Sequence, residues 1–123
     1  MISFDDFSMN DQTPIYMQIV MYIKRGIVAK IVENNDELPS RRTLSSFLGV
    51  NPNTVQKAYR ILEEEGLIES HLGAKSYMLL DDEKIKKISE ELLENDAKNI
   101  VLSMKQMGIQ KEQAIDLIIR YWE

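Results

Sequence analysis

The stretch that decides the fold is residues 38–59, which read LPSRRTLSSFLGVNPNTVQKAY. Ser40 is placed to cap a short helix, because a serine oxygen accepts a free N–H of the first helical turn. Gly49 then ends that helix, since glycine readily adopts the left-handed backbone of a helix terminus. Asn51-Pro52 repeats the start signal, with a capping side chain followed by proline at the first helical position. Two helices joined by a short turn that contains glycine are typical of a helix-turn-helix.

The apolar residues of these two helices indicate which side of each faces a core. The first helix covers residues 41–48, and its expected inward residues are Leu44, Phe47 and Leu48. The second extends to about Glu65, where Gly66 closes it, and its apolar face consists of Val55, Ala58, Tyr59 and Leu62. Each helix therefore has a side that needs packing partners elsewhere in the chain.

The segment before this motif predicts another helix. Thr13-Pro14 is a cap followed by proline, and it opens a helix to about Val32 in which isoleucines recur every four residues as far as Ile31. A second set of apolar residues lies on another face, so this helix is expected to be buried on two sides. Residues 33–37 are polar and acidic, and they are expected to form a loop.

After Gly66 the pattern changes to short runs that suit β-strands. These runs are residues 67–70 and 76–80, and the turn between them contains Gly73. His71, at the start of the turn, is assigned to the surface. Three helices followed by a hairpin make a winged helix-turn-helix.

The C-terminal part predicts two further helices. Asp81 and Asp82 are candidate caps, and the apolar positions of residues 84–107 follow two directions about a quarter turn apart. Either this helix breaks near Asn95-Asp96, or its two halves face different surfaces. Gly108 ends it, and the last short helix has apolar residues in helical spacing at Ile115, Ile118, Ile119 and Trp122. The exposed faces can be buried on a second copy of the chain or on the chain's own domain.

Composition excludes several classes of function. The chain has 123 residues, no cysteine and one histidine, so it lacks the ligands of thiolate and two-histidine metal sites. We expect no catalytic residue, no metal site and no cofactor, and therefore no enzyme. The longest apolar stretch, residues 15–32, is interrupted by three cations, which argues against a transmembrane helix. Residues 1–7 lack an export signal, so a cytoplasmic location without a membrane partner is expected.

The distribution of charge is uneven. The net charge of −5 by itself argues against nucleic-acid binding. Residues 38–60, however, contain four cations and no acid. One short face can therefore attract phosphate within an acidic protein. The alternative is an ordinary solvated helix face.

The second helix of a helix-turn-helix enters the major groove of DNA with its N-terminus first. Asn and Gln side chains pair with adenine, Thr contacts thymine, and the helix N-terminus offers free N–H groups to a phosphate. Two arginines on the first turn of the preceding helix are expected beside this end, and the hairpin turn adds a glycine and a lysine. The predicted DNA-binding residues are Arg41, Arg42, Asn51, Asn53, Thr54, Gln56, Lys57, Gly73 and Lys75.

The expected fold class is mainly α-helical with a small β-hairpin. Residues 1–80 are predicted to form a winged helix-turn-helix DNA-binding domain. Residues 81–123 are predicted to form a two-helix C-terminal dimerisation segment.

Three quoted stretches carry a resemblance to a known family. LPSRRTL at residues 38–44, LGVNPNTVQKAY at 48–59 and LEEEGLI at 62–68 resemble the GntR family of bacterial transcriptional regulators, in order and in spacing. The similarity extends over residues 14–80. The NPNTV stretch and the short C-terminal part are similar to the YtrA-type subgroup. This resemblance implies a winged helix with two dimerising helices, no large ligand-binding domain, and a link to the control of transporter operons.

The resemblance also implies roles for particular residues. Arg42 occupies the position of the family's arginine that contacts DNA ahead of the recognition helix, and Gly73 that of its wing-tip glycine. Asn53, Thr54, Gln56 and Lys57 occupy its recognition-helix contact positions. Pro52 stands where other members have an arginine, so that base contact is expected to be absent. In the wing, Gly73-Ala74-Lys75 replaces the usual Gly-x-Gly, and Lys75 adds a phosphate contact.

We therefore expect a homodimeric, sequence-specific regulator, a repressor, that binds an inverted-repeat operator in double-stranded DNA. The main alternative is a winged-helix module that binds protein without binding DNA. A fragment of a larger enzyme is a weaker alternative, since no catalytic constellation is visible. The sequence does not identify a small-molecule effector, although Met104 and Met107 are candidates to line a cleft between the last helices and the wing.

Overall fold

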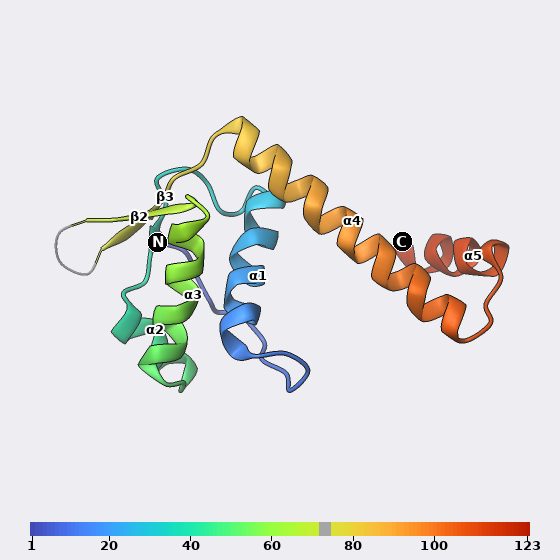
Figure 1. Ribbon diagram of the computed structural model, residues 1–123, viewed down its shortest axis with the longest axis horizontal. Coiled ribbons are helices and arrows are strands. Elements are labelled where there is room, and N and C mark those ends of the chain that lie inside the picture. Colours follow the sequence, from blue (N-terminus) through green and yellow to red (C-terminus); the bar gives the residue numbers. More distant parts are fainter. Residues whose placement is uncertain (72–74) are drawn as a thin grey trace. The chain divides into compact units, whose positions relative to one another are not determined.

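The computed structural model describes residues 1–71 and 75–123. These residues form five helices and a small antiparallel sheet, so the predicted mainly helical fold with a β-hairpin is confirmed. The order of the elements can be followed in Figure 1. The chain divides into two compact units, residues 1–88 and 89–123. This division falls inside helix α4, whereas the sequence placed a domain boundary after residue 80, and that boundary stays a prediction.

Helix α1 spans Ile15–Val28 and buries Ile19, Ile23 and Ile27 in the core of the first unit. The predicted helix over residues 14–32 is wrong at both ends. Pro14 precedes the helix in an extended conformation, and no side chain caps the first turn. The C-terminal end falls four residues earlier than the periodicity predicts.

The chain leaves α1 by folding back over Gly26. The backbone N–H groups of Ile31 and Val32 both donate to the carbonyl oxygen of Gly26, at 2.9 and 3.0 Å, and Lys30 takes a left-handed φ of 63°. Val32 is buried beside Gly26, where an added Cβ would lie 2.7 Å from Val32 Cγ2. Ile31, expected on the buried face of a longer helix, is instead 78% exposed. Packing at one glycine, rather than helical periodicity, determines where α1 ends.

The helix-turn-helix has the predicted bounds, with α2 at Arg41–Leu48 and α3 at Pro52–Glu64. Ser40 Oγ accepts the N–H of Thr43 at 3.1 Å, and Gly49 ends α2 with a φ of 69°. The predicted apolar face of α3 is buried throughout, at Val55, Ala58, Tyr59 and Leu62.

One core prediction for α2 is wrong, because Phe47 is 60% exposed. The buried residues of α2 are Leu44 and Ser45, so its inner face is rotated away from Phe47. The Ser45 hydroxyl donates to the carbonyl oxygen of Arg42 at 3.0 Å, which satisfies this polar group inside the core.

The sheet has the order β1-β3-β2, with both pairs antiparallel. Strands β2 and β3, at Ile68–Ser70 and Ser76–Met78, form the predicted hairpin and are shorter than the expected runs. The third strand, β1 at Glu37–Leu38, was not predicted, because two residues carry no detectable alternation. It pairs with β3 and leads directly into the start of α2.

Helix α4 spans Asp82–Gln106 and begins with a cap, in which Asp81 Oδ1 accepts the N–H of Lys84 at 2.8 Å. It continues without a break through Asn95 and Asp96, so the alternative of a broken helix is wrong. Its N-terminal half buries Ile88 and Leu92. Its C-terminal half exposes a series of apolar residues, Leu93, Ile100, Val101 and Leu102.

Helix α5 spans Lys111–Trp122 and follows Gly108, whose φ is 73°. No residue of α5, all of which the structure describes, is buried in the single chain. The four apolar residues in helical spacing on this helix are exposed, and Trp122 is 83% exposed. Within the described ranges, no helix is long and apolar enough to cross a bilayer.

Candidate nucleic-acid interface

The first turn of α3 uses its own side chains and backbone as a cap. Asn51 Oδ1 accepts the N–H of Asn53 at 2.8 Å, and the N–H of Thr54 donates to the carbonyl oxygen of Asn51 at 2.9 Å. Pro52 has no N–H group. The first three residues of α3 therefore keep no free backbone donor, and the expectation that this helix terminus offers N–H groups to a phosphate is wrong. Contacts from this end must come from side chains.

The polar side chains of α3 differ in exposure. Asn53 and Lys57 are exposed, whereas Thr54 and Gln56 are half-buried on the flanks of the helix. Asn51 is exposed too, although its side-chain oxygen is occupied by the cap. The buried face of α3 holds the helix in the core, so these side chains lie on the remaining surface.

The two arginines of α2 lie in different environments. Arg42 is exposed, whereas Arg41 is half-buried and its guanidinium carbon lies 5.3 Å from the centroid of the Tyr59 ring. Its Nε is buried, and no group among the described residues is a hydrogen-bond partner for it. Tyr59 lies two turns into α3, so Arg41 does not lie beside the first turn as expected. The short turn brings the end of α2, not its beginning, to the start of α3.

Tyr59 is a core residue, as predicted, and is 1% exposed. Its hydroxyl donates to the carbonyl oxygen of Pro39 at 2.6 Å, which ties α3 to the segment between β1 and α2. Burial raises the pKa of Tyr59, and the nearby Arg41 guanidinium opposes that shift. The tyrosine therefore stays neutral and helps to orient the first turn of α2.

Lys57 has a partner that the sequence did not reveal. Its Nζ lies 4.1 Å from the centroid of the Tyr16 ring, in the first turn of α1. A cation over an aromatic face is worth about 0.5–1 kcal/mol at an exposed site. The two residues are far apart in sequence, so no local pattern links them. The contact limits the conformations of an otherwise flexible side chain at the proposed DNA surface.

The described base of the wing carries His71, which was assigned to the surface, and Lys75, which belongs to the predicted DNA-binding residues. The N–H of His71 donates to the carbonyl oxygen of Lys75 at 2.8 Å, and both residues are exposed. The surface assignment of His71 is confirmed, and its ring lies edge-on to Tyr77 at 5.2 Å. Gly73, the predicted wing-tip residue, lies outside the described residues.

One acidic residue at the end of α3, Glu65, has a cationic partner on α1. Lys24 Nζ and Glu65 Oε1 form an ion pair of 3.0 Å that joins α1 to the end of α3.

In the part of the chain that the structure describes, no group of three or more His, Cys, Asp or Glu side chains is placed to hold a metal ion.

A capped helix-turn-helix, a β-hairpin behind it and exposed cationic and amide side chains on its second helix define a winged-helix protein of the DNA-binding class. Residues 15–77 match the family described as "Bacterial regulatory proteins, gntR family", and the chain belongs to this family. The resemblance inferred from the three quoted stretches is confirmed.

Relatives support the same assignment. The chain is 36% identical to the HTH-type transcriptional repressor YtrA of Bacillus subtilis, over 82% of this chain and 78% of that protein. It is 30% identical to the HTH-type transcriptional regulator YhcF of the same organism, over 96% and 98%. A solved GntR family transcriptional regulator from Listeria monocytogenes is 36% identical, with a TM-score of 0.79 over 91% of this chain and 98% of that one. The family and these relatives are regulators of transcription rather than enzymes.

Proposed function

We propose that this GntR-family regulator is a cytoplasmic repressor that binds an inverted-repeat operator as a homodimer. The observation that carries the proposal is the surface of α2 and α3, where Arg42, Asn53 and Lys57 are exposed within a stretch that contains no acid. Such a surface combines phosphate attraction with groups that distinguish bases. Residues 1–80 act as the DNA-binding domain, and residues 81–123 as the dimerisation segment.

The proposed contacts divide into two kinds. Asn53, Thr54 and Gln56 read base edges in the major groove, since amide and hydroxyl groups can form specific hydrogen bonds there. Arg42 is assigned to a base edge as well, because its planar guanidinium suits guanine. The phosphate contacts are assigned to Lys57 and to the wing residues Gly73 and Lys75. Asn51 contributes mainly as the cap of α3. Arg41 contacts DNA through the part of its guanidinium that Tyr59 leaves free.

Dimerisation through the C-terminal helices is supported by apolar side chains that a single chain leaves exposed. On α4 these are Val101 and Leu102, and on α5 they are Ile115, Ile118 and Ile119. A second copy is the proposed occupant, because an inverted repeat requires two recognition helices related by a two-fold axis. The half-sites would lie about one helical turn, roughly 10 base pairs, apart.

Repression and the control of a transporter operon are the most specific parts of the proposal. Repression is supported by the name of the YtrA relative, which is a transcriptional repressor. The link to transporters comes from the resemblance to the YtrA-type subgroup. The link to transporters is tested by the identity of the genes next to the protected DNA, and repression by whether transcription of those genes falls when the chain is bound.

The experiment is footprinting of the purified chain on DNA that flanks its own gene, with affinity measured at several salt concentrations. We expect two protected half-sites of inverted symmetry. Arg42→Ala should weaken binding and relax base preference, and Lys57→Ala should lower the salt slope by about one. Lys30→Asn, which removes an exposed cation outside α2, α3 and the dimerisation segment, is the matched control and should leave both unchanged.

The dimer is tested separately with Ile118→Asp, because no residue of α5 needs burial in the single chain for that helix to form. We expect sedimentation to report a monomer and the operator affinity to fall. A wild-type chain that is strictly monomeric and does not shift any duplex at low salt would refute the proposal. Salt-insensitive binding to a protein would instead favour the interaction-module alternative.

A further inference from the structure

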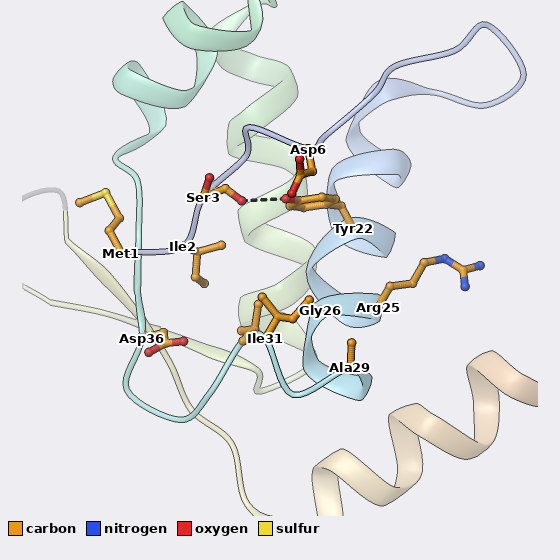
Figure 2. Close-up of a pocket in the computed structure, with 11 residues that line it drawn as sticks. Met1, Ile2, Ser3, Asp6, Tyr22, Arg25, Gly26, Ala29, Ile31 and Asp36 are labelled. Carbon is orange, nitrogen blue, oxygen red and sulfur yellow. Dashed lines mark hydrogen bonds between the residues drawn. The ribbon is translucent and has the colours of Figure 1, made fainter.

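A cavity of about 490 Å³ lies within the first unit, beside the C-terminal half of α1 (Figure 2). It is bordered by the N-terminal segment, by the C-terminal half of α1 and by the loop that follows it. Its size falls within the range of roughly 300–1,000 Å³ that small-molecule sites occupy. None of the residues that line it belongs to the predicted DNA-binding set.

The walls of the cavity are held in place. The N–H of Ile2 donates to the carbonyl oxygen of Glu37 at 2.8 Å, next to the sheet, and the Tyr22 hydroxyl donates to the carbonyl oxygen of Ser3 at 2.7 Å. Phe4 is buried, with its ring 4.8 Å from that of Tyr22. The N-terminal segment is therefore packed as a wall, and the cavity is preformed.

The lining combines apolar side chains with carboxylates. Apolar atoms come from Ile2, Ala29 and Ile31, and carboxylates from Asp6 and Asp36. Such a combination is typical of sites that take an amphipathic small molecule.

The two carboxylates differ in their hydrogen bonding. Asp36 Oδ2 accepts the N–H of Glu33 at 2.8 Å. The carboxylate of Asp6 makes no hydrogen bond and no ion pair among the residues that the structure describes, and Figure 2 places it beside the Tyr22 hydroxyl. One carboxylate is thus available to a ligand.

Two carboxylates, those of Asp6 and Asp5, act on the Tyr22 hydroxyl at this wall. Burial first, and then the charges of Asp6 and Asp5, raise the pKa of the Tyr22 hydroxyl. Arg25 contributes its stem to the lining, and Figure 2 shows its guanidinium extending away from Ile2 and Ile31. A positively charged group therefore meets the more favourable field near Asp6.

We propose that this cavity binds a small organic cation, an ammonium group carried on a compact apolar body. The ammonium group pairs with the Asp6 carboxylate, beside the Tyr22 hydroxyl. The apolar body lies against Ile2, Ala29 and Ile31. The site is independent of the proposed operator binding, because it involves none of the residues assigned to DNA.

The test uses three probes that share one ring and differ in charge: benzyltrimethylammonium, benzyl alcohol and phenylacetate. Each is titrated into the ¹⁵N-labelled full-length chain, and the amide signals of Gly26, Ala29 and Ile31 are followed by NMR. We expect saturable shifts of these signals with the cation and weaker, non-saturating shifts with the other two. Asp6→Asn should weaken the affinity for the cation about fivefold, as loss of one partly solvated ion pair implies.

Asp11→Asn is the matched control, since it removes an exposed carboxylate of the same segment that does not line the cavity. Ala29→Phe, which fills the cavity from the end of α1, should abolish the shifts. Equal responses to all three probes, or an affinity that Asp6→Asn leaves unchanged, would overturn the proposal. A gel shift on the same samples reports operator binding separately, so failure of one proposal is distinguishable from failure of the other.

Discussion

Replacing Gly26 by alanine sets two effects of opposite sign against each other. In a helix interior, alanine is favoured over glycine by about 0.8–1 kcal/mol, so a propensity argument alone predicts stabilisation. In this fold the added Cβ would lie 2.7 Å from Val32 Cγ2 and 3.6 Å from Val32 Cβ. Something must therefore move.

Val32 cannot withdraw easily. Its side chain is buried, and its backbone N–H is bound to the carbonyl oxygen of Gly26 itself at 3.0 Å. Overpacking a core of this kind costs roughly 1–3 kcal/mol. We expect Gly26→Ala to lower the free energy of unfolding by about 1 kcal/mol, because the clash outweighs the gain in helix propensity.

The double variant separates the two effects. Val32→Ala alone should destabilise by roughly 2 kcal/mol through lost burial, and in that background Gly26→Ala should stabilise by about 1 kcal/mol, since its clashing partner is gone. The coupling is measured by urea unfolding of all four chains at one fixed protein concentration. A Gly26→Ala single variant that is more stable than wild type, or additive effects in the cycle, would refute the reasoning.

Three further predictions concern the helix-turn-helix. The pKa of Tyr59 is raised in the folded state, so its contribution to the free energy of unfolding should be fully present below the usual tyrosine pKa of about 10 and should fall as the pH rises above that value. In urea unfolding, Tyr59→Phe should lose less stability at alkaline pH than the wild-type chain. Tyr16→Leu should weaken operator binding about two- to fivefold, because it releases the side chain of Lys57. Tyr16→Phe keeps the aromatic ring and should keep the affinity. Tighter binding by the leucine variant would contradict the role assigned to Tyr16. Asn51→Ala should lower the unfolding free energy by about 1 kcal/mol through loss of the cap of α3, and an unchanged urea midpoint would contradict this.

The elements that could be predicted from sequence are those whose signals are local. Ser40, Gly49 and Asn51-Pro52 each act on backbone groups within three residues, so the bounds of α2 and α3 follow directly from them. The end of α1 does not, because it depends on Val32 closing over Gly26. Strand β1 is too short to have a pattern, and it exists because β3 pairs with it.

The same distinction between local signals and distant contacts applies to the candidate interface. Residue types on α3 indicated a polar, cationic surface, and the structure places Asn53 and Lys57 on it. The contacts that organise the surface join distant segments, Tyr16 with Lys57 and Arg41 with Tyr59. No spacing rule connects such pairs, since their separation reflects how whole helices cross.

The closed first turn of α3 has a consequence for divergence among related regulators. Because the cap and Pro52 leave no backbone donor at this end, recognition of DNA has to come from side chains, which single substitutions can change. Exposed positions such as Asn53 and Lys57 can then change by single substitutions without loosening the helix that carries them. Duplicated copies of such a gene can acquire separate targets while retaining one scaffold.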